Sequence, residues 1–282
     1  MHTIDEYIQK AHHLVPAPHV LPQLLPLLNS IEVDNGKIVE IISYDTSLTG
    51  TVLRICNSAY YSRGTQIDNL LQAVTRLGMR EVYRIVVAVT SAASLSAGQK
   101  GYGVEAADLW KHSVTTAVGA QLVAREAGED ENVAFTAAIL HDVGKIILAT
   151  AMEDLYEKFT QEANSGHSLV EIEEKLLGCN HAEVGARLLE RWKLPEHLVA
   201  GVRYHHKPAA TSDAHQRLAA CVYLGNFIAY FMGNGYGHHA LSLAGRDETL
   251  KILKLSAERL PQYMEECFGR LKQVKGLYNL KG

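Results

Sequence analysis

Eight polar side chains from residue 108 onward are of the types that bind transition metals. They comprise five histidines, two aspartates and, more weakly, one asparagine. In chain order they are Asp108, His112, His141, Asp142, His181, His205, His206 and Asn226. Neutral imidazoles and carboxylates make up the iron, manganese, zinc and nickel sites of proteins. Their recurrence therefore predicts a metal site, although it does not name a reaction.

The spacing of these residues fits ligands contributed by several helices. Asp108 and His112 are four residues apart and share one face of a helix. His141 and Asp142 are adjacent, so on a helix their side chains point about 100° apart. One ion can take both only if it lies between helices and has other ligands. Lys145 follows His141 by about one turn and can reach the same cleft.

Each of these residues also has an ordinary structural explanation. His112 lies on an apolar stripe, where a core histidine bonded to a backbone carbonyl is common. Lys145 can equally be a solvated lysine on a helix surface, and His181 can be a surface residue near a helix cap. His205 and His206 end a helix, where positive charge is favoured. Taken together, on separate helices at ordered intervals, they predict a shared site.

The composition narrows the class of protein. With 282 residues, 47% of them apolar, the chain can form one large core or two smaller cores that share an interface. A net charge of −4 and a pI near 6.4, without a basic stripe, argue against nucleic acid as a partner. The four cysteines are far apart and form no CxxC pair, which indicates buried thiols in a reducing compartment.

Neither a leader nor a membrane span is expected. Residues 1–6 lack a cationic start followed by an apolar core, unlike a signal peptide. The longest apolar stretch, 218–233, is shorter than the ~20 residues that a membrane span needs. We therefore expect a cytoplasmic protein that has no membrane partner.

Hydrophobic periodicity predicts an all-α fold of two helical lobes. Apolar residues recur every three and four positions, and strand-like alternation is scarce. The segment 92–105, which holds Gly98, Gly101 and Gly103, is the expected boundary between the lobes. We expect an N-terminal helical lobe over 1–100, a metal-binding lobe over 101–240 and an amphipathic helical tail over 241–282.

Several short motifs carry a family resemblance. In the N-terminal lobe they are LPQL at 21–24, Ile41 and Ile42 with Asp45, LRICNS at 53–58 and AVTRLG at 73–78. In the C-terminal lobe they are LWKHS at 109–113, LHDVGK at 140–145, HAEVG at 181–185, WKLP at 192–195 and HHKP at 205–208. Over about residues 14–230 the chain resembles the HDOD family, a signalling-output branch of the HD superfamily. The resemblance implies an HD-type helical bundle in the C-terminal lobe.

The histidines are also similar to the multinuclear metal site of the HD-GYP phosphodiesterases. That likeness implies six metal ligands, which are His112, His141, Asp142, His181, His205 and His206. It implies an extra acidic ligand at Asp108, as in trinuclear sites, and a catalytic, phosphate-facing lysine at Lys145. We expect transition-metal ions, two in number, drawn from iron, manganese, zinc and nickel. Asp142 is the best bridge between them, because a carboxylate has two oxygens and an imidazole one free lone pair.

Two departures from the related diesterases weigh against rapid turnover. Where the superfamily has a late metal-binding aspartate, this chain has Asn226, a neutral and weaker ligand. After His205 and His206 come Lys207 and Pro208, without an acidic residue or a GYP motif, and the glycine–tyrosine–glycine run at 235–237 comes too late to serve.

Three functions remain open at this level. The first is a regulatory HDOD module that acts through signalling proteins or a phosphate-containing small ligand, with its metal retained for structure or sensing. The second is an active metal-dependent phosphohydrolase. The third is a helical scaffold without metal. We rank them in that order, and the chain can also form homo-oligomers.

Overall fold

The structure is a computed structural model that describes residues 2–14, 20–28, 35–58, 61, 66–235 and 245–273. Within these ranges the secondary structure is helical, and the only β-type pairing is an isolated antiparallel bridge between Gln99 and Val104. The prediction of an all-α fold is confirmed. Tyr236 and Gly237 of the late glycine–tyrosine–glycine run, and residues 241–244 and 274–282 of the expected tail, lie outside the described residues.

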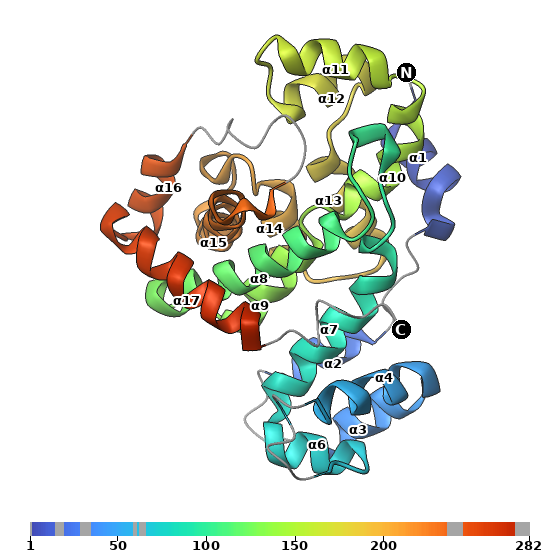
Figure 1. Ribbon diagram of the computed structural model, residues 1–282, viewed down its shortest axis with the longest axis vertical. Helices are drawn as coiled ribbons and strands as arrows, with labels where there is room; N and C mark the ends of the chain where they lie inside the picture. Colours follow the sequence, from blue (N-terminus) through green and yellow to red (C-terminus); the bar gives the residue numbers. More distant parts are fainter. Residues whose placement is uncertain are drawn as a thin grey trace.

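A group of helices from the N-terminal third forms one end of the molecule (Figure 1). It consists of α2 (Leu21–Leu28), α3 (Asn35–Ser43), α4 (Thr46–Cys56), α6 (Leu70–Leu77) and α7 (Met79–Leu95). Asp45 and Asn69 start α4 and α6 by accepting hydrogen bonds from the amides of Leu48 and Gln72, each over 2.9 Å. The long helix α7 joins this group to the rest of the chain and packs against α9 (Glu131–Leu140).

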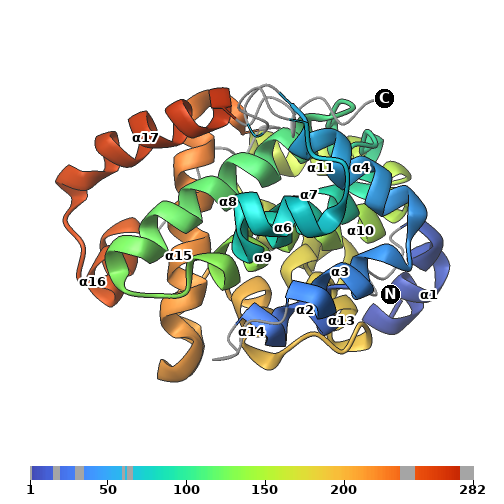
Figure 2. The ribbon, with the colours of Figure 1, turned by 90° about the horizontal axis from the view of Figure 1, so that it is seen from below.

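The remaining helices build the larger body of the molecule (Figures 1 and 2). They are α8 (Asp108–Ala127), α9, α10 (Val143–Glu153), α11 (Tyr156–Asn164), α12 (Leu169–Leu177), α13 (His181–Arg191), α14 (Glu196–Arg203), α15 (Asp213–Ala229), α16 (Arg246–Leu253) and α17 (Leu260–Gln273). Helices α8, α9 and α15 pack on one another, while α10, α13 and α14 adjoin them. The elements that carry the predicted ligands therefore meet in one bundle.

Both ends of the described chain pack against this bundle. The first helix, α1 (Ile4–Ala11), lies on α10 and α13, and the Tyr7 hydroxyl donates to the carbonyl of Leu177. At the other end α16 packs on α15, and α17 runs along α8 (Figure 1).

The glycine-containing segment between α7 and α8 is a packed part of the structure. It contains the short helix η2 (Lys100–Tyr102), which lies against α10. Gly101 approaches α10 so closely that an added Cβ would contact the backbone at Ala149 and Glu153. The segment expected to separate two lobes thus fixes the chain to α10. The division at residues 1–100, 101–240 and 241–282 stays a prediction.

One stretch of the described chain has the length and apolarity of a membrane span. It runs from Glu131 to Glu153, and 89% of its most apolar window is buried inside the protein. The core helices of globular domains pass the same test. A corner at His141 and Asp142 also divides the stretch into α9 and α10. We therefore interpret it as the core of the bundle.

Candidate metal centre

The corner between α9 and α10 positions the His141–Asp142 pair. His141 follows the last residue of α9, and Asp142 immediately precedes α10, so the chain turns within two residues. Both side chains are completely buried. Just beyond the corner, Gly144 lets α10 approach the first turn of α13, where His181 is the first helical residue. The corner thus brings the pair beside a third predicted ligand.

One oxygen of the Asp142 carboxylate faces two histidines. The Nε2 atom of His112, from α8, lies 3.6 Å from Asp142 Oδ2. The Nε2 atom of His141 lies 3.3 Å from the same oxygen. The ligand atoms of these three residues all lie within 4.8 Å of one another, a separation that one metal ion can span. We call His112, His141 and Asp142 the first half-site.

The other oxygen of Asp142 faces a second group of histidines. His181 Nε2 lies 3.3 Å from Asp142 Oδ1, and His205 Nε2 lies 3.9 Å from it. His206, the next residue, has its Nε2 atom 2.8 Å from the Nε2 atom of His181. His181, His205 and His206 again lie close enough to share one ion. We call these three the second half-site, and Asp142 stands between the two.

The outer nitrogens of the histidines are held by hydrogen bonds. The Nδ1 atoms of His141 and His205 lie 2.6 Å from the carbonyls of Ala138 and Val202. The Nδ1 atom of His112 lies 3.0 Å from the carbonyl of Asn234. A carbonyl only accepts, so each Nδ1 must donate, and a neutral ring then directs its Nε2 lone pair inward. This is the arrangement in which proteins hold metal-binding histidines.

The charges of the site favour a cation. Burial lowers the pKa of His112 to about 3 and holds that of His205 well below its usual range, so both are neutral near pH 7. Burial raises the pKa of Asp142, but His141, Lys145 and His181 together lower it by more, and the carboxyl stays ionised. Inward lone pairs thus meet a carboxylate in a buried space. A metal ion between them would satisfy both, so these residues fit the group that the sequence predicts.

Lys145 points at the carboxylate of the centre. Its side chain is 2% exposed, and its Nζ donates to Asp142 Oδ2 over 2.7 Å. The alternative of a solvated surface lysine is therefore wrong. The lysine contacts the Asp142 oxygen that faces the first half-site, and its predicted role toward a phosphate stays a prediction.

The two remaining predicted residues, Asp108 and Asn226, belong to neither half-site. Asp108 begins α8 with a side chain that is 39% exposed and accepts from Lys111 over 3.4 Å. Its role as an additional ligand stays a prediction. Asn226 is buried on α15, and its Oδ1 accepts no hydrogen bond from any described residue.

Two residues that the motifs did not identify support the centre. Glu173 on α12 is fully buried and accepts from both the amide and the Nδ1 of His181, over 2.9 and 2.6 Å. Burial lowers the pKa of His181, but the carboxylates of Glu173 and Asp142 together raise it by more, and the net pKa lies above the usual value. Tyr230, in the π-helical turn η4 (Tyr230–Asn234), stacks obliquely on His112 with ring centroids 5.0 Å apart. The sequence feature that could have identified Glu173 is its position, because it is an acidic residue on the apolar face of a helix.

The metal-free protein is expected to lose stability in acid. His112 and His205 are neutral when folded but accept a proton near pH 6.5 when unfolded. Below that pH the unfolded chain binds more protons, and each residue removes about 1.4 kcal/mol per pH unit. The contribution of His181 is fully present below about pH 6.5 and is lost only as the pH rises through its raised folded pKa. It therefore offsets part of the loss. Burial also holds the pKa of His206 well below its usual range, so His206 adds to the loss.

Urea unfolding in the presence of a chelator measures this effect. The free energy of unfolding should be lower at pH 5.5 than at pH 7.5 by about 2–3 kcal/mol. The same unfolding free energy at both values would contradict the neutral, buried state assigned to His112 and His205.

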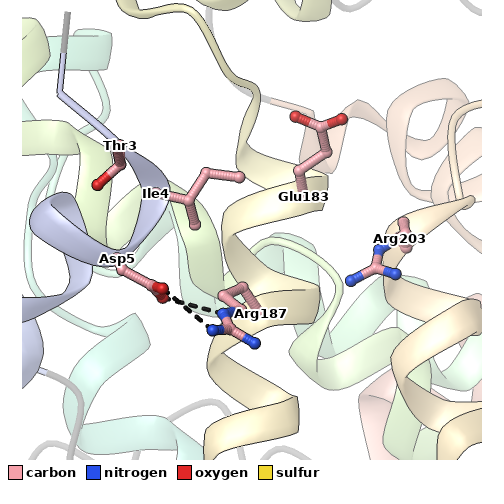
Figure 3. Close-up of a pocket in the computed structure, with 6 residues that line it drawn as sticks. All are labelled: Thr3, Ile4, Asp5, Glu183, Arg187 and Arg203. Carbon is pink, nitrogen blue, oxygen red and sulfur yellow. Dashed lines mark hydrogen bonds and ion pairs between the residues drawn. The ribbon is translucent and has the colours of Figure 1, made fainter.

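A pocket of about 460 Å³ has none of the predicted ligands in its lining (Figure 3). Its lining residues come from the start of the chain and from α13 and α14, and they are Thr3, Ile4, Asp5, Glu183, Arg187 and Arg203. The guanidinium groups are engaged within the protein. Arg187 donates to Asp5 over 2.9 and 3.0 Å, and Arg203 donates to Glu190 over 2.7 Å. The pocket therefore offers no uncommitted guanidinium to an anion.

The fold and the centre define an all-helical protein with a site in its larger bundle where histidines surround a carboxylate. The profile of the HDOD domain matches residues 14–208, more than two thirds of the chain. The chain belongs to the HDOD family. The matched region contains the six predicted ligands, from His112 to His206, whereas α1 and α15 to α17 lie outside it.

One curated relative and two solved structures are similar to the chain, and the structures share its fold. The chain is 25% identical over 221 residues to an uncharacterized protein of Treponema pallidum (strain Nichols), covering 76% of this chain and 42% of that protein. The chain thus spans less than half the length of this relative. An HDOD domain protein with unknown function from Geobacter sulfurreducens has the same fold, with 21% identity, a TM-score of 0.79 and coverage of 98% and 96% of the two chains. A protein from Shewanella amazonensis, described as a candidate phosphohydrolase, is 23% identical, with a TM-score of 0.72 and 96% coverage of each chain.

Proposed function

We propose that the protein is an HDOD regulatory module that retains a pair of transition-metal ions in its HD-type bundle. One observation carries the proposal, which is that the Asp142 carboxylate stands between two groups of histidines. Each group would hold one ion, and Asp142 would bridge the two. A bound ion would supply Lewis acidity toward an anionic ligand and would lower the pKa of a bound water molecule.

The ligand set favours iron, manganese, zinc or nickel. Imidazole nitrogens outnumber carboxylates in both half-sites. Calcium and magnesium prefer sites made of oxygen atoms, so they fit this centre poorly.

The experiment that tests the proposal is elemental analysis of protein purified without oxygen. About two equivalents of transition metal per chain are expected. Less than a trace of metal, even after reconstitution, would overturn the proposal and favour a scaffold without metal. A chelator-treated sample reconstituted with zinc or manganese provides the matched comparison.

A regulatory role is favoured over catalysis by three features of the chain. Lys145 is buried and bound to Asp142, so a contact with a reacting phosphoryl group would require it to leave that ion pair. Asn226 supplies no charge where the related diesterases have an aspartate, and Lys207 adds a positive charge after the paired histidines. The module would then act in the cytoplasm through signalling proteins or a phosphate-containing small ligand. It would bind neither nucleic acid nor membrane, and it can form a homo-oligomer.

The second candidate function is a metal-dependent phosphohydrolase. It is favoured by the same shared carboxylate, because two ions held together are the usual device for phosphoryl chemistry. In that case Lys145 would have to leave Asp142 and contact the phosphoryl group.

Hydrolysis of cyclic dinucleotides and nucleotides is expected to be weak or absent in metal-loaded protein. The ligand set has one negative charge fewer than that of the diesterases, so it tunes a bound water less effectively. Asn226→Asp is expected to raise metal retention and any residual rate. The measurement is turnover of both substrate classes by the two proteins. Robust turnover by the unmodified protein, abolished by Asp142→Ala, would reverse the order of the two functions.

A further inference from the structure

A buried glutamate holds the second half-site from behind. Glu173 is 0% exposed, and no lysine or arginine among the described residues lies within ion-pair distance of it. Burying a carboxylate costs several kcal/mol unless its oxygens are well bonded. The structure therefore keeps a charge in its interior at a position where an apolar side chain would fill the space at less cost.

The sequence of α12 places this glutamate on the core side of the helix. Ile172 and Leu177 are buried, whereas the neighbouring Glu174 is exposed. Glu173 and Leu177 are one turn apart, so the glutamate occupies the apolar face. An acidic residue on this buried face does not contact water, so it does not contribute to the solubility of the protein.

The hydrogen bonds of Glu173 are directed at one predicted ligand. Its Oε2 accepts from the amide of His181 over 2.9 Å and from the Nδ1 of His181 over 2.6 Å. The ring is thereby held so that Nε2 faces Asp142 Oδ1 at 3.3 Å. In the other completely buried histidines of the centre the outer nitrogen meets a backbone carbonyl. His181 alone among these has a full negative charge behind it, which makes its inner nitrogen a stronger donor to a metal.

The second oxygen of Glu173 is held by the segment between α7 and α8. The Tyr102 hydroxyl donates to Glu173 Oε1 over 2.7 Å. Tyr102 is itself buried, and its ring packs edge-on against Phe159 at 5.9 Å. Gly101, the preceding residue, lies against the backbone of α10. This contact fixes the position of η2 and therefore that of Tyr102.

We propose that Tyr102 and Glu173 are positioning residues that set the metal affinity of the second half-site through His181. The inference rests on the proposed metal centre. It adds a regulatory consequence, since any partner that moves the segment 98–103 would withdraw Tyr102 and loosen the ion at His181, His205 and His206. The ion at the first half-site would be held as before.

The chain offers a matched pair of variants for the test. Glu173→Gln keeps the size of the side chain and removes its charge. Glu174→Gln removes the same charge one residue away, from an exposed side chain that accepts from Asn180. Zinc titration of chelator-treated protein by calorimetry measures the two binding steps separately in each.

In Glu173→Gln we expect the zinc ion of the second half-site to bind about 10- to 100-fold more weakly, while the affinity of the first half-site for zinc is unchanged. Glu174→Gln should bind both ions like the unmodified protein. A purely structural role for Glu173 as an anchor for the start of α13 predicts a lower melting temperature with equal zinc affinities, and that result would overturn the inference. Loss of both ions in equal measure would overturn it too.

Tyr102→Phe keeps the test decisive if the glutamine variant does not fold. It removes one hydroxyl and leaves the ring against Phe159, so a smaller weakening of the second ion alone is expected, of about tenfold. Unchanged zinc affinities in this variant would overturn the part assigned to Tyr102. Failure of the unmodified protein to bind any zinc is a distinct outcome, which would overturn the proposed metal centre and this inference with it.

Discussion

Replacing Asp142 with asparagine is expected to abolish retention of both metal ions and to destabilise the metal-free protein. The carboxylate faces both half-sites, so its charge is lost to both ions at once. It also neutralises the buried ammonium of Lys145. Removing one partner of a buried ion pair costs about 3–5 kcal/mol, because the other charge stays in the interior. An asparagine oxygen can still accept from the lysine, so we expect the lower end of that range.

Metal retention and the stability of the metal-free protein are measured separately. Elemental analysis should find less than a tenth of the metal of the unmodified protein, and urea unfolding with a chelator should give the loss in the metal-free state. Asp154→Asn is the control, since Asp154 is an exposed aspartate just beyond α10. His141→Ala is informative beside it, because it removes a ligand of the first half-site only. If Asp142→Asn kept one full equivalent of metal, the carboxylate would serve a single ion and would not bridge two.

The six predicted ligands could be identified from the sequence because of where they lie. They fall within short family motifs, which fixes their order along the chain. Only His112 and His181 lie within helices, whereas His141 and Asp142 form the corner between α9 and α10, and His205 and His206 follow the end of α14 at Arg203 rather than ending the helix as expected. The structure brings four of the histidines to the Asp142 carboxylate, and the fifth, His206, lies against His181. What periodicity could not supply was the division of the histidines between the two carboxylate oxygens. That depends on the corner between α9 and α10 and on the close approach of α13, which are tertiary features.

The residues that hold His181 in place could not be predicted from sequence patterns, for a similar reason. Glu173 lies in a helix that carries no family motif, and its partner Tyr102 lies in a segment whose glycines suggested a loose boundary. Glycine marks both flexible linkers and close backbone contacts, and the sequence alone does not distinguish them. Lys145 shows the same ambiguity. Its spacing gave its distance from His141 along the helix, but only the packing decides between solvent and Asp142.

Gly144→Ala is expected to disrupt the second half-site as strongly as any ligand substitution. A Cβ atom at this position would touch the carbonyl oxygen of His181 and would lie 2.7 Å from the amide nitrogen of Gly185. Both are backbone atoms of α13, so no side chain can rotate away to make room. The two helices would have to separate, and overpacking of this kind costs about 1–3 kcal/mol. The separation would also draw His181 away from Asp142, whose facing atoms are 3.3 Å apart.

The matched control is Gly269→Ala on α17, where an added Cβ meets no atom within 4 Å. Alanine is the better helix former, so this change should raise the free energy of unfolding by about 0.5–1 kcal/mol. Gly144→Ala should instead lower the free energy of unfolding and weaken the second zinc ion, whereas the first half-site keeps its ligands on α8 and at the corner. Unfolding by urea and calorimetric zinc titration of both variants provide the comparison. If Gly144→Ala stabilised the protein as Gly269→Ala does, with both zinc ions bound normally, the contact between α10 and α13 would not control the site. The second half-site would then owe its geometry to α14 and to Glu173 alone.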